Sequence, residues 1–167
     1  MNKQAQRFRQ LVDWRAAAWA GLASGLFSLL VNSALTGIAL GNPWLFVRMN
    51  AGILLGVGAV DSTAGFSAGI AVAGALVYLM FSLLFGALVA FIVHRWGIAV
   101  GILGGAGIGL ALYVLAVYGL SALYPWFYEL RNWMMLVSTV VYGAVAGGLY
   151  EAWEVEVFVP VEKEGGQ

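Results

Sequence analysis

The stretch "IAVGILGGAGIGLALYVLAVYGLSAL" (residues 98–123) decides the fold, because it contains no charged residue over a length that can cross a bilayer. An α-helix of about 20 apolar residues spans the roughly 30 Å of hydrocarbon in a membrane. The stretch also has glycines at four-residue spacing, and helices in lipid associate where small residues let their backbones approach closely. It therefore predicts a transmembrane helix with one glycine-lined contact face.

The rest of the chain has the same apolar character. Hydrophobic residues make up 62% of the 167 residues and charged residues 10%, with a mean hydropathy of +0.90, whereas soluble domains are about half apolar and a quarter charged. A net charge of zero argues against a nucleic-acid-binding surface. The chain has no cysteine, which excludes disulfides and thiolate-bound metals. These features predict an integral membrane protein, for which we expect no cofactor.

Four runs are long and apolar enough to cross the membrane, at about residues 16–40, 69–93, 98–123 and 133–153. The segment at about 43–57 contains Arg48 and Asn50 and is too short to cross, so we expect a helix that lies at the interface or re-enters the membrane. The predicted fold is an all-α integral membrane protein in which residues 16–153 form a four-helix transmembrane domain.

Lys and Arg residues are distributed unequally between the two sides of the membrane. The side that holds the basic N-terminus (residues 1–15) and the acidic tail (residues 154–167) has six of them, and the opposite side has two. These are Lys3, Arg7, Arg9, Arg15, Arg95 and Lys163 on the first side, and Arg48 and Arg131 on the second. Because basic residues accumulate in cytoplasmic segments, we expect both termini in the cytoplasm. The first span exceeds the core of a cleavable signal peptide, so we expect it to be retained.

Glycines at four-residue spacing occur in three of the four spans. They are Gly21 and Gly25, then Gly97, Gly101, Gly105 and Gly109, then Gly143 and Gly147. We interpret them as helix-packing positions. Such a face can contact a helix of the same chain or of another protein, so a homo-oligomer and a larger complex both stay open. Membrane lipids are expected to bind around the helices.

The two loops on the side away from the termini resemble each other, since Pro43-Trp44 in one corresponds to Pro125-Trp126 in the other. The resemblance reflects either a duplicated helix pair or the ordinary use of Pro and Trp at a membrane interface. If the two loops have a function, their acidic and basic residues would pair in a polar cap on the outer face. The cap would comprise Arg48, Asp61, Glu129 and Arg131.

No charged residue lies in the middle of a span, so the deepest strongly polar pair is Asn32 and Ser33 in the first. Hydrogen bonds between helices explain this pair, together with the other serines, threonines and tyrosines of the spans, and a substrate or water path is the alternative. The single histidine, His94, ends the second span beside Arg95. It is a weak candidate for a haem ligand, because it would need a second ligand or an open position.

The C-terminal tail alternates valine with glutamate. Val155, Val157, Val159 and Val161 fall on one face of an extended segment, and this period of two indicates a β-strand. A single strand has no partner inside a four-helix protein. We therefore expect the tail to remain loose or to dock on an edge of a partner protein.

The segments "ALGNPWLFVRMNAGILLG" and "VYGAVAGGLYEAW" give the chain a resemblance to small four-helix bacterial inner-membrane proteins, some of them named for acid resistance. The resemblance extends over residues 16–153 and rests on a Pro-Trp pair, an arginine, a glycine-ended helix and a glycine-rich last span. It implies the same four-helix fold and a location in the bacterial cytoplasmic membrane. It carries no activity and no site residues.

Three functions fit these features. The first is a non-catalytic accessory or structural subunit that packs against a larger respiratory or photosynthetic membrane complex through its glycine faces and its tail. The second is a small oligomeric transporter or channel that uses Asn32 and Ser33 as a path. The third is a membrane enzyme or a cofactor-binding protein, for which His94 is a weak candidate site residue. Glycine faces directed outward would favour the first, and polar residues around a cavity would favour the second.

Overall fold

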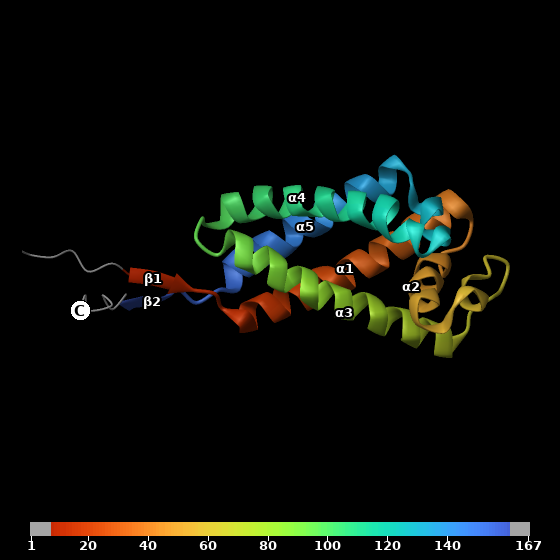
Figure 1. Cartoon of the computed structure of the whole chain (residues 1–167), viewed down its shortest axis with the longest axis horizontal. Helices are drawn as coiled ribbons and strands as arrows, with labels where there is room; N and C mark the ends of the chain where they lie inside the picture. Colours follow the sequence, from red (N-terminus) through yellow and green to blue (C-terminus); the bar gives the residue numbers. More distant parts are fainter. Residues whose placement is uncertain (1–7, 161–167) are drawn as a thin grey trace, which may run out of the picture.

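A computed structural model describes residues 8–160 as a long bundle of helices with a short β-ribbon at one end (Figure 1). The elements in chain order are β1 (Phe8–Leu11), α1 (Trp14–Leu40), α2 (Leu45–Leu55), the 3-10 helix η1 (Val57–Val60), α3 (Ala68–Val93), α4 (Ile98–Val114), the π-helix η2 (Leu115–Gly119), the 3-10 helices η3 (Leu120–Ala122) and η4 (Pro125–Leu130), α5 (Trp133–Trp153) and β2 (Val157–Pro160).

Four helices are long and apolar enough to cross a membrane, namely α1, α3, the continuous stretch Ile98–Ala122 and α5. This confirms the predicted helical class and the four helices that could cross a membrane, as in a multi-pass membrane protein. Helix α2 is the predicted short helix between the first two spans. Its residues from Leu45 to Gly52 are all buried against the rest of the chain, so α2 packs inside one end of the bundle (Figure 1).

Helices α4 and α5 form the most extensive contact in the bundle, and glycines on both sides make it possible. A Cβ atom on Gly105 would overlap the backbone of Gly143, and one on Gly147 would overlap the carbonyl of Gly101. Further along, Gly109 faces the backbone of Thr139. Backbones this close gain dispersion contacts that larger side chains would prevent.

The predicted glycine face of the third span begins one turn later than expected. Gly97 precedes α4, has φ of 76° and would meet nothing within 4 Å if it carried a Cβ. It belongs to the turn after α3, where its positive φ lets the chain reverse direction. The contact face therefore consists of Gly101, Gly105 and Gly109.

Helix α3 has its own small residues, which bring it against α1 and α2. A Cβ on Gly21 of α1 would lie 2.7 Å from the carbonyl oxygen of Ser82, and a Cβ on Gly86 would lie 2.6 Å from the Cα of Gly21. Gly25 faces the side chain of Ser82 in the same way. At the other end of α3, Gly74 admits the backbone of Val47 from α2.

The expectation that the tail strand has no partner within the chain is wrong. Strand β2 pairs antiparallel with β1, with Leu11 opposite Val157 and Phe8 opposite Pro160. The partner comes from the N-terminal segment, because an even number of spans returns both ends of the chain to the same end of the bundle (Figure 1). Val155, Val157 and Val159 belong to the described tail, and the predicted docking residue Val161 lies outside the described residues.

Asp13 connects this ribbon to the helices. Its carboxylate caps α1 by accepting hydrogen bonds from the amides of Arg15 at 2.9 Å and Ala16 at 3.0 Å, and it also accepts one from the amide of Val155 at 3.2 Å. These bonds, that from Ala16 above all, lower the pKa of Asp13 below its usual 3.8. One side chain thus holds the start of the first span beside the end of the last.

We predict that the glycines of α4 differ sharply in their tolerance of a methyl group. Gly105→Ala should lower the stability of the bundle by about 1–3 kcal/mol, because the new Cβ meets the backbone of α5. Gly107→Ala, on the same helix, should be neutral or stabilise by up to about 1 kcal/mol, since nothing lies within 4 Å and alanine favours helix. Thermal unfolding in detergent measures both, and equal midpoints would contradict the assigned contact face.

A second prediction concerns acid. The lowered pKa of Asp13 means that its carboxylate stabilises the fold above the unfolded-state pKa, and that this contribution disappears as the pH falls through the folded-state pKa. Asp13→Asn keeps a capping side chain but cannot titrate. The thermal midpoint of the wild type should therefore fall more between pH 6 and about pH 3 than that of Asp13→Asn. If the thermal midpoints of the two proteins fell equally over this pH range, the Asp13 carboxylate would not have this stabilising role.

Candidate functional site

A cavity of about 300 Å³ lies between α3 and α4, in the half of the bundle that contains α2. Its walls come from all four spanning helices, and α2 and η4 contribute residues at one end. Most of the lining is apolar. The polar side chains are Ser28, Asn32, Asn50, Tyr78, Ser82, Tyr113, Thr139 and Tyr142.

Small residues bring α3 and α4 together only near their connecting turn, where Gly104 faces the side chain of Val93. Further along, Gly101, Gly105 and Gly109 of α4 face α5, and Gly74 and Gly86 of α3 face α2 and α1. Toward α4, helix α3 directs large side chains such as Phe85 and Leu88, which line the cavity together with Leu112 of α4. The two helices therefore diverge from their short connecting turn, as Figure 1 shows, and few residues connect them.

The cavity opens sideways, at the surface that lipid would cover. Phe81, Leu84 and Leu88 of α3 line it and are also exposed on the outside of the bundle, Leu84 to 62%. These residues belong to spanning segments. A molecule dissolved in the membrane can therefore reach the cavity without first crossing water.

A chain of hydrogen bonds crosses three helices on the side of the cavity opposite this opening. The Tyr78 hydroxyl of α3 donates to Ser28 Oγ of α1 at 2.8 Å, and Asn32 Nδ2 donates to the same oxygen at 3.1 Å. Ser138 of α5 donates to Asn32 Oδ1 at 2.7 Å. Asn32 and Ser138 are buried, so these bonds satisfy polar groups that lipid could not.

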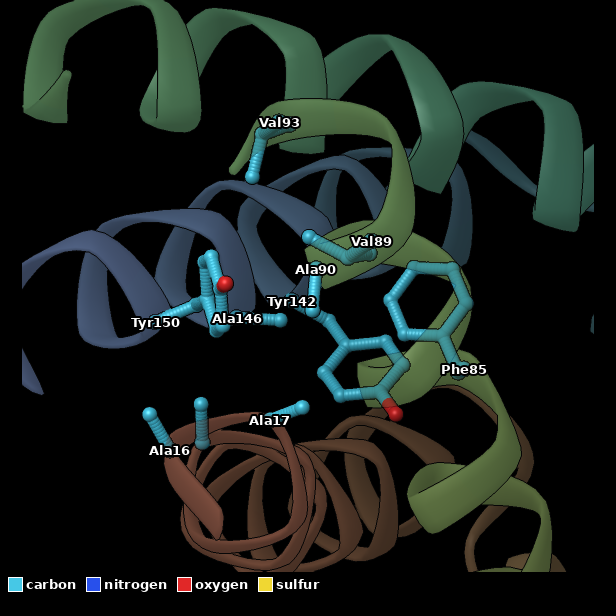
Figure 2. Close-up of a cluster of buried hydrophobic side chains, with 10 residues drawn as sticks. Ala16, Ala17, Phe85, Val89, Ala90, Val93, Tyr142, Ala146 and Tyr150 are labelled. Atoms are coloured by element: carbon cyan, nitrogen blue, oxygen red, sulfur yellow. The ribbon is translucent and has the colours of Figure 1, made fainter. Parts of the chain in front are cut away.

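Tyr142 stands beside this chain of hydrogen bonds but is not part of it. Its ring reaches from α5 and stacks on Phe85 of α3, with ring centroids 4.7 Å apart. Figure 2 shows its hydroxyl directed away from α5 toward the space between α1 and α3. The side chain is only 3% exposed, and its hydroxyl oxygen is fully buried. It makes no hydrogen bond of regular geometry among the described residues, although the Ser82 hydroxyl lies beside it. A buried hydroxyl without a partner costs about 1–3 kcal/mol.

The structure places the two residues of the predicted polar path differently. Asn32 lines the cavity and is held by Ser28 and Ser138. Ser33 does not line it, because adjacent residues of a helix point in directions about 100° apart. Hydrogen bonds join Asn32 to Ser28 one turn away and to Ser138 of α5, and Ser28 in turn to Tyr78 of α3. A list of polar residues alone does not reveal that pairing.

The wall formed by the end of the third span is irregular. Helix α4 continues into the π-helix η2, whose Ala116 and Val117 line the cavity. Single π-helical turns occur frequently at functional sites, because they change the direction of side chains within a helix. The sequence predicts one regular helix through this stretch, so the π-helical turn is visible only in the structure.

The predicted outer polar cap does not form as a set of ion pairs. Arg48 is 5% exposed and donates to the carbonyl oxygens of Ala59 at 3.0 Å and Gly65 at 2.6 Å. Asp61 instead accepts hydrogen bonds from the amide and hydroxyl of Thr63, which lower its pKa, whereas Arg48 has only a weak influence on it. Arg48 is drawn inward because it sits on a buried helix beneath a loop whose carbonyl groups need donors.

The other half of the predicted cap lies apart at the surface. Arg131 is exposed, and its guanidinium lies 5.1 Å from the ring centroid of Tyr118. Glu129 is exposed as well. The two loops that looked alike in sequence thus use their arginines differently, one as a buried donor and one at a surface aromatic ring. Trp126 also has a specific role, since its Nε1 donates to the carbonyl of Met49 in α2 at 3.1 Å.

Both ring nitrogens of His94 have partners within the chain. Nδ1 lies 3.0 Å from the carbonyl oxygen of Phe91, to which it donates, and Nε2 accepts from Arg95 at 3.1 Å. A haem iron at Nε2 would have to displace Arg95, so the geometry gives His94 no advantage as a ligand. Among residues 8–160, His, Asp and Glu side chains do not gather in groups of three that could hold a metal ion.

Comparisons of the chain with protein-family models, with curated proteins and with solved structures gave no match. The chemistry of the cavity is therefore the basis for assigning a function.

We predict that the two arginines of the outer loops respond differently to the same change. Arg48→Lys should destabilise by about 1–3 kcal/mol and raise hydrogen exchange in residues 57–66, because an ammonium cannot reach both carbonyl groups in the same fork geometry. Arg131→Lys should change stability by less than about 0.5 kcal/mol, as exposed substitutions usually do. Equal effects of the two changes would contradict these different roles and would favour a polar cap in which both arginines act alike.

Proposed function

We propose that this protein is a non-catalytic membrane protein that binds a small amphipathic molecule dissolved in the bilayer. The single observation that carries the proposal is the cavity between α3 and α4, which is apolar at its lateral opening and polar at its inner wall. Ligand sites are commonly apolar clefts with a few polar groups that fix orientation. A molecule with an apolar body and one polar end matches this division.

The size of the cavity limits what it can hold. Its volume of about 300 Å³ is at the lower end of the range for small-molecule sites. A ring or a short chain segment fits inside, and a longer apolar tail would extend through the lateral opening into lipid. The exposed leucines at the opening provide a surface for such a tail.

The hypothesis of an accessory subunit in a larger complex stays a prediction, but the glycine faces and the tail give it less support than the sequence suggested. It relied on glycine faces available to a partner, and those of α1, α4 and α5 contact helices of the same chain. The tail that was expected to dock elsewhere pairs with β1. A partner complex would therefore have to use the large apolar side chains on the outside of the bundle.

Transport is the second candidate, and the chain of hydrogen bonds around Asn32 is the observation that favours it. Residues that line the cavity include no Lys, Arg, His, Asp or Glu, and intramembrane charges are the usual mark of ion or proton coupling. Movement of a neutral amphiphile between the membrane and the cavity fits this lining better than an aqueous path does. For an enzyme, the described residues around the cavity supply no evident general base beside a nucleophile.

Filling the cavity tests the proposed function. Ala116→Phe places a large ring on the cavity wall, whereas Ala111→Phe places the same ring on the exposed side of the same helix. We expect Ala116→Phe to weaken binding of a neutral probe, 2-tridecanone, by about five- to a hundredfold, the equivalent of about 1–3 kcal/mol, because the ring occupies the space that the probe needs. Native mass spectrometry of protein released from phosphatidylcholine nanodiscs measures the bound probe.

Ala111→Phe is the matched control and should bind the probe as the wild type does. If all three proteins retain the probe equally, it binds to the outer surface and the proposed function fails. If the wild type retains none, the cavity is not a binding site for neutral amphiphiles of this size.

A further inference from the structure

We infer that the molecule held between α3 and α4 carries an uncharged hydroxyl group, as in a long-chain alcohol or an acylglycerol, which donates a hydrogen bond to Oδ1 of Asn50. This inference rests on the proposed function and names the chemical class of its ligand. Asn50 lines the cavity from α2, the short helix at the end of the bundle opposite the β-ribbon (Figure 1).

Helical geometry places the Asn50 side chain on the wall of the cavity. Phe46 and Ile53 of α2 line the cavity as well, and residues three or four positions apart lie on one face of a helix. Nδ2 of Asn50 donates to the carbonyl oxygen of Phe46 at 2.9 Å. This bond fixes which end of the side-chain amide is the donor, so Oδ1 is the end left for another partner.

Oδ1 of Asn50 is an acceptor that a ligand can reach. It accepts no hydrogen bond among the described residues, where the side-chain oxygens both without a partner and fully covered by the protein belong to Tyr142, Glu151 and Glu154. Oδ1 of Asn50 is not one of these covered atoms, so it keeps accessible surface. Because residues Leu45 to Gly52 are all buried against the rest of the chain, that surface faces the cavity.

Other polar groups around the cavity already have hydrogen bonds within the chain. Oδ1 of Asn32 accepts from Ser138. The hydroxyls of Tyr78, Tyr113 and Thr139 each donate to an oxygen of the protein. A buried amide oxygen without any partner gains most from a new donor, since leaving it unpaired costs free energy. It is therefore the preferred contact for the polar end of a ligand.

The lining selects an uncharged donor. The described residues that line the cavity include no Lys, Arg, His, Asp or Glu, so an ammonium group would have no counter-ion there. A hydroxyl group needs only one acceptor. With the hydroxyl at Asn50, the apolar part of the molecule can extend along the lateral opening, which is lined by Phe81, Leu84 and Leu88.

The test compares three probes with the same number of carbon atoms: 2-tridecanol, which can donate a hydrogen bond, 2-tridecanone, which can only accept one, and tridecane, which does neither. The proteins are the wild type, Asn50→Leu and Thr139→Val, all in phosphatidylcholine nanodiscs, and native mass spectrometry measures the bound probe. Leucine resembles asparagine in shape and removes the amide. Thr139→Val is the matched control, because it removes a hydroxyl that lines the same cavity and keeps the shape of the side chain.

Asn50→Leu should weaken binding of 2-tridecanol about three- to tenfold, the effect of one neutral hydrogen bond. The same change should leave binding of tridecane and 2-tridecanone within about twofold of the wild type, because neither can donate to Oδ1. Thr139→Val should bind all three probes as the wild type does. Comparing variant with wild type for one probe removes the contribution of partitioning into lipid.

The wild type tests the inference even if Asn50→Leu does not fold. At equal mole fraction in the lipid, it should retain 2-tridecanol about three- to tenfold more tightly than 2-tridecanone. Equal retention of these two probes would overturn the hydroxyl class.

The variants provide the other contradicting outcomes. Unchanged binding of 2-tridecanol to Asn50→Leu, or a loss confined to Thr139→Val, would remove Asn50 as the contact. Equal losses of the alcohol and the ketone in Asn50→Leu would show that the amide does not act as an acceptor for a hydroxyl. In these cases the proposed function would stand as long as Ala116→Phe still blocks the retained probe. Failure of the wild type to retain any of the three would instead end the proposed function itself.

Discussion

Close contact between helix backbones is the constraint on which the rest of this structure depends. In lipid, apolar side chains gain little by leaving one hydrocarbon environment for another, so helices associate where glycines let backbones touch. Gly105 against Gly143, and Gly21 against Gly86, determine which helices become neighbours. They divide the bundle into a pair formed by α4 and α5 and a pair formed by α1 and α3. Helix α1 also packs against α5, so the two pairs are joined there, whereas α3 and α4 contact each other little and enclose the cavity between large side chains.

Hydrogen bonds between buried polar side chains join the two helix pairs. Asn32 connects α1 to α5 through Ser138, and its neighbour Ser28 connects α1 to α3 through Tyr78. A polar group in a membrane interior is tolerated when its hydrogen bonds are made within the protein. Among the described residues, the hydroxyl of Tyr142 and one carboxylate oxygen each of Glu151 and Glu154 are buried without a hydrogen-bond partner.

Helix α2 closes one end of the cavity and depends on two long-range contacts. Arg48 on its buried face holds the following loop through Ala59 and Gly65. Trp126, which is far along the chain, donates to the carbonyl of Met49. At the opposite end of the bundle, Asp13 binds both the start of α1 and the amide of Val155, so the ribbon of β1 and β2 is continuous with the helices.

Four helices able to cross a membrane, and most of the glycines that act as contact points, could be predicted from the sequence, because length, composition and four-residue spacing are local properties of the chain. Contacts between distant residues could not be predicted in this way: they include which glycines meet, the place of Gly97 in a turn, and the inward direction of Arg48 while Arg131 stays at the surface. The tertiary structure alone paired β2 with β1, since that contact joins residues from opposite ends of the chain. The cavity has the same origin. Its walls come from the four spanning helices, α2 and η4, and its shape depends on which small residues are already engaged elsewhere, which no single stretch of sequence contains.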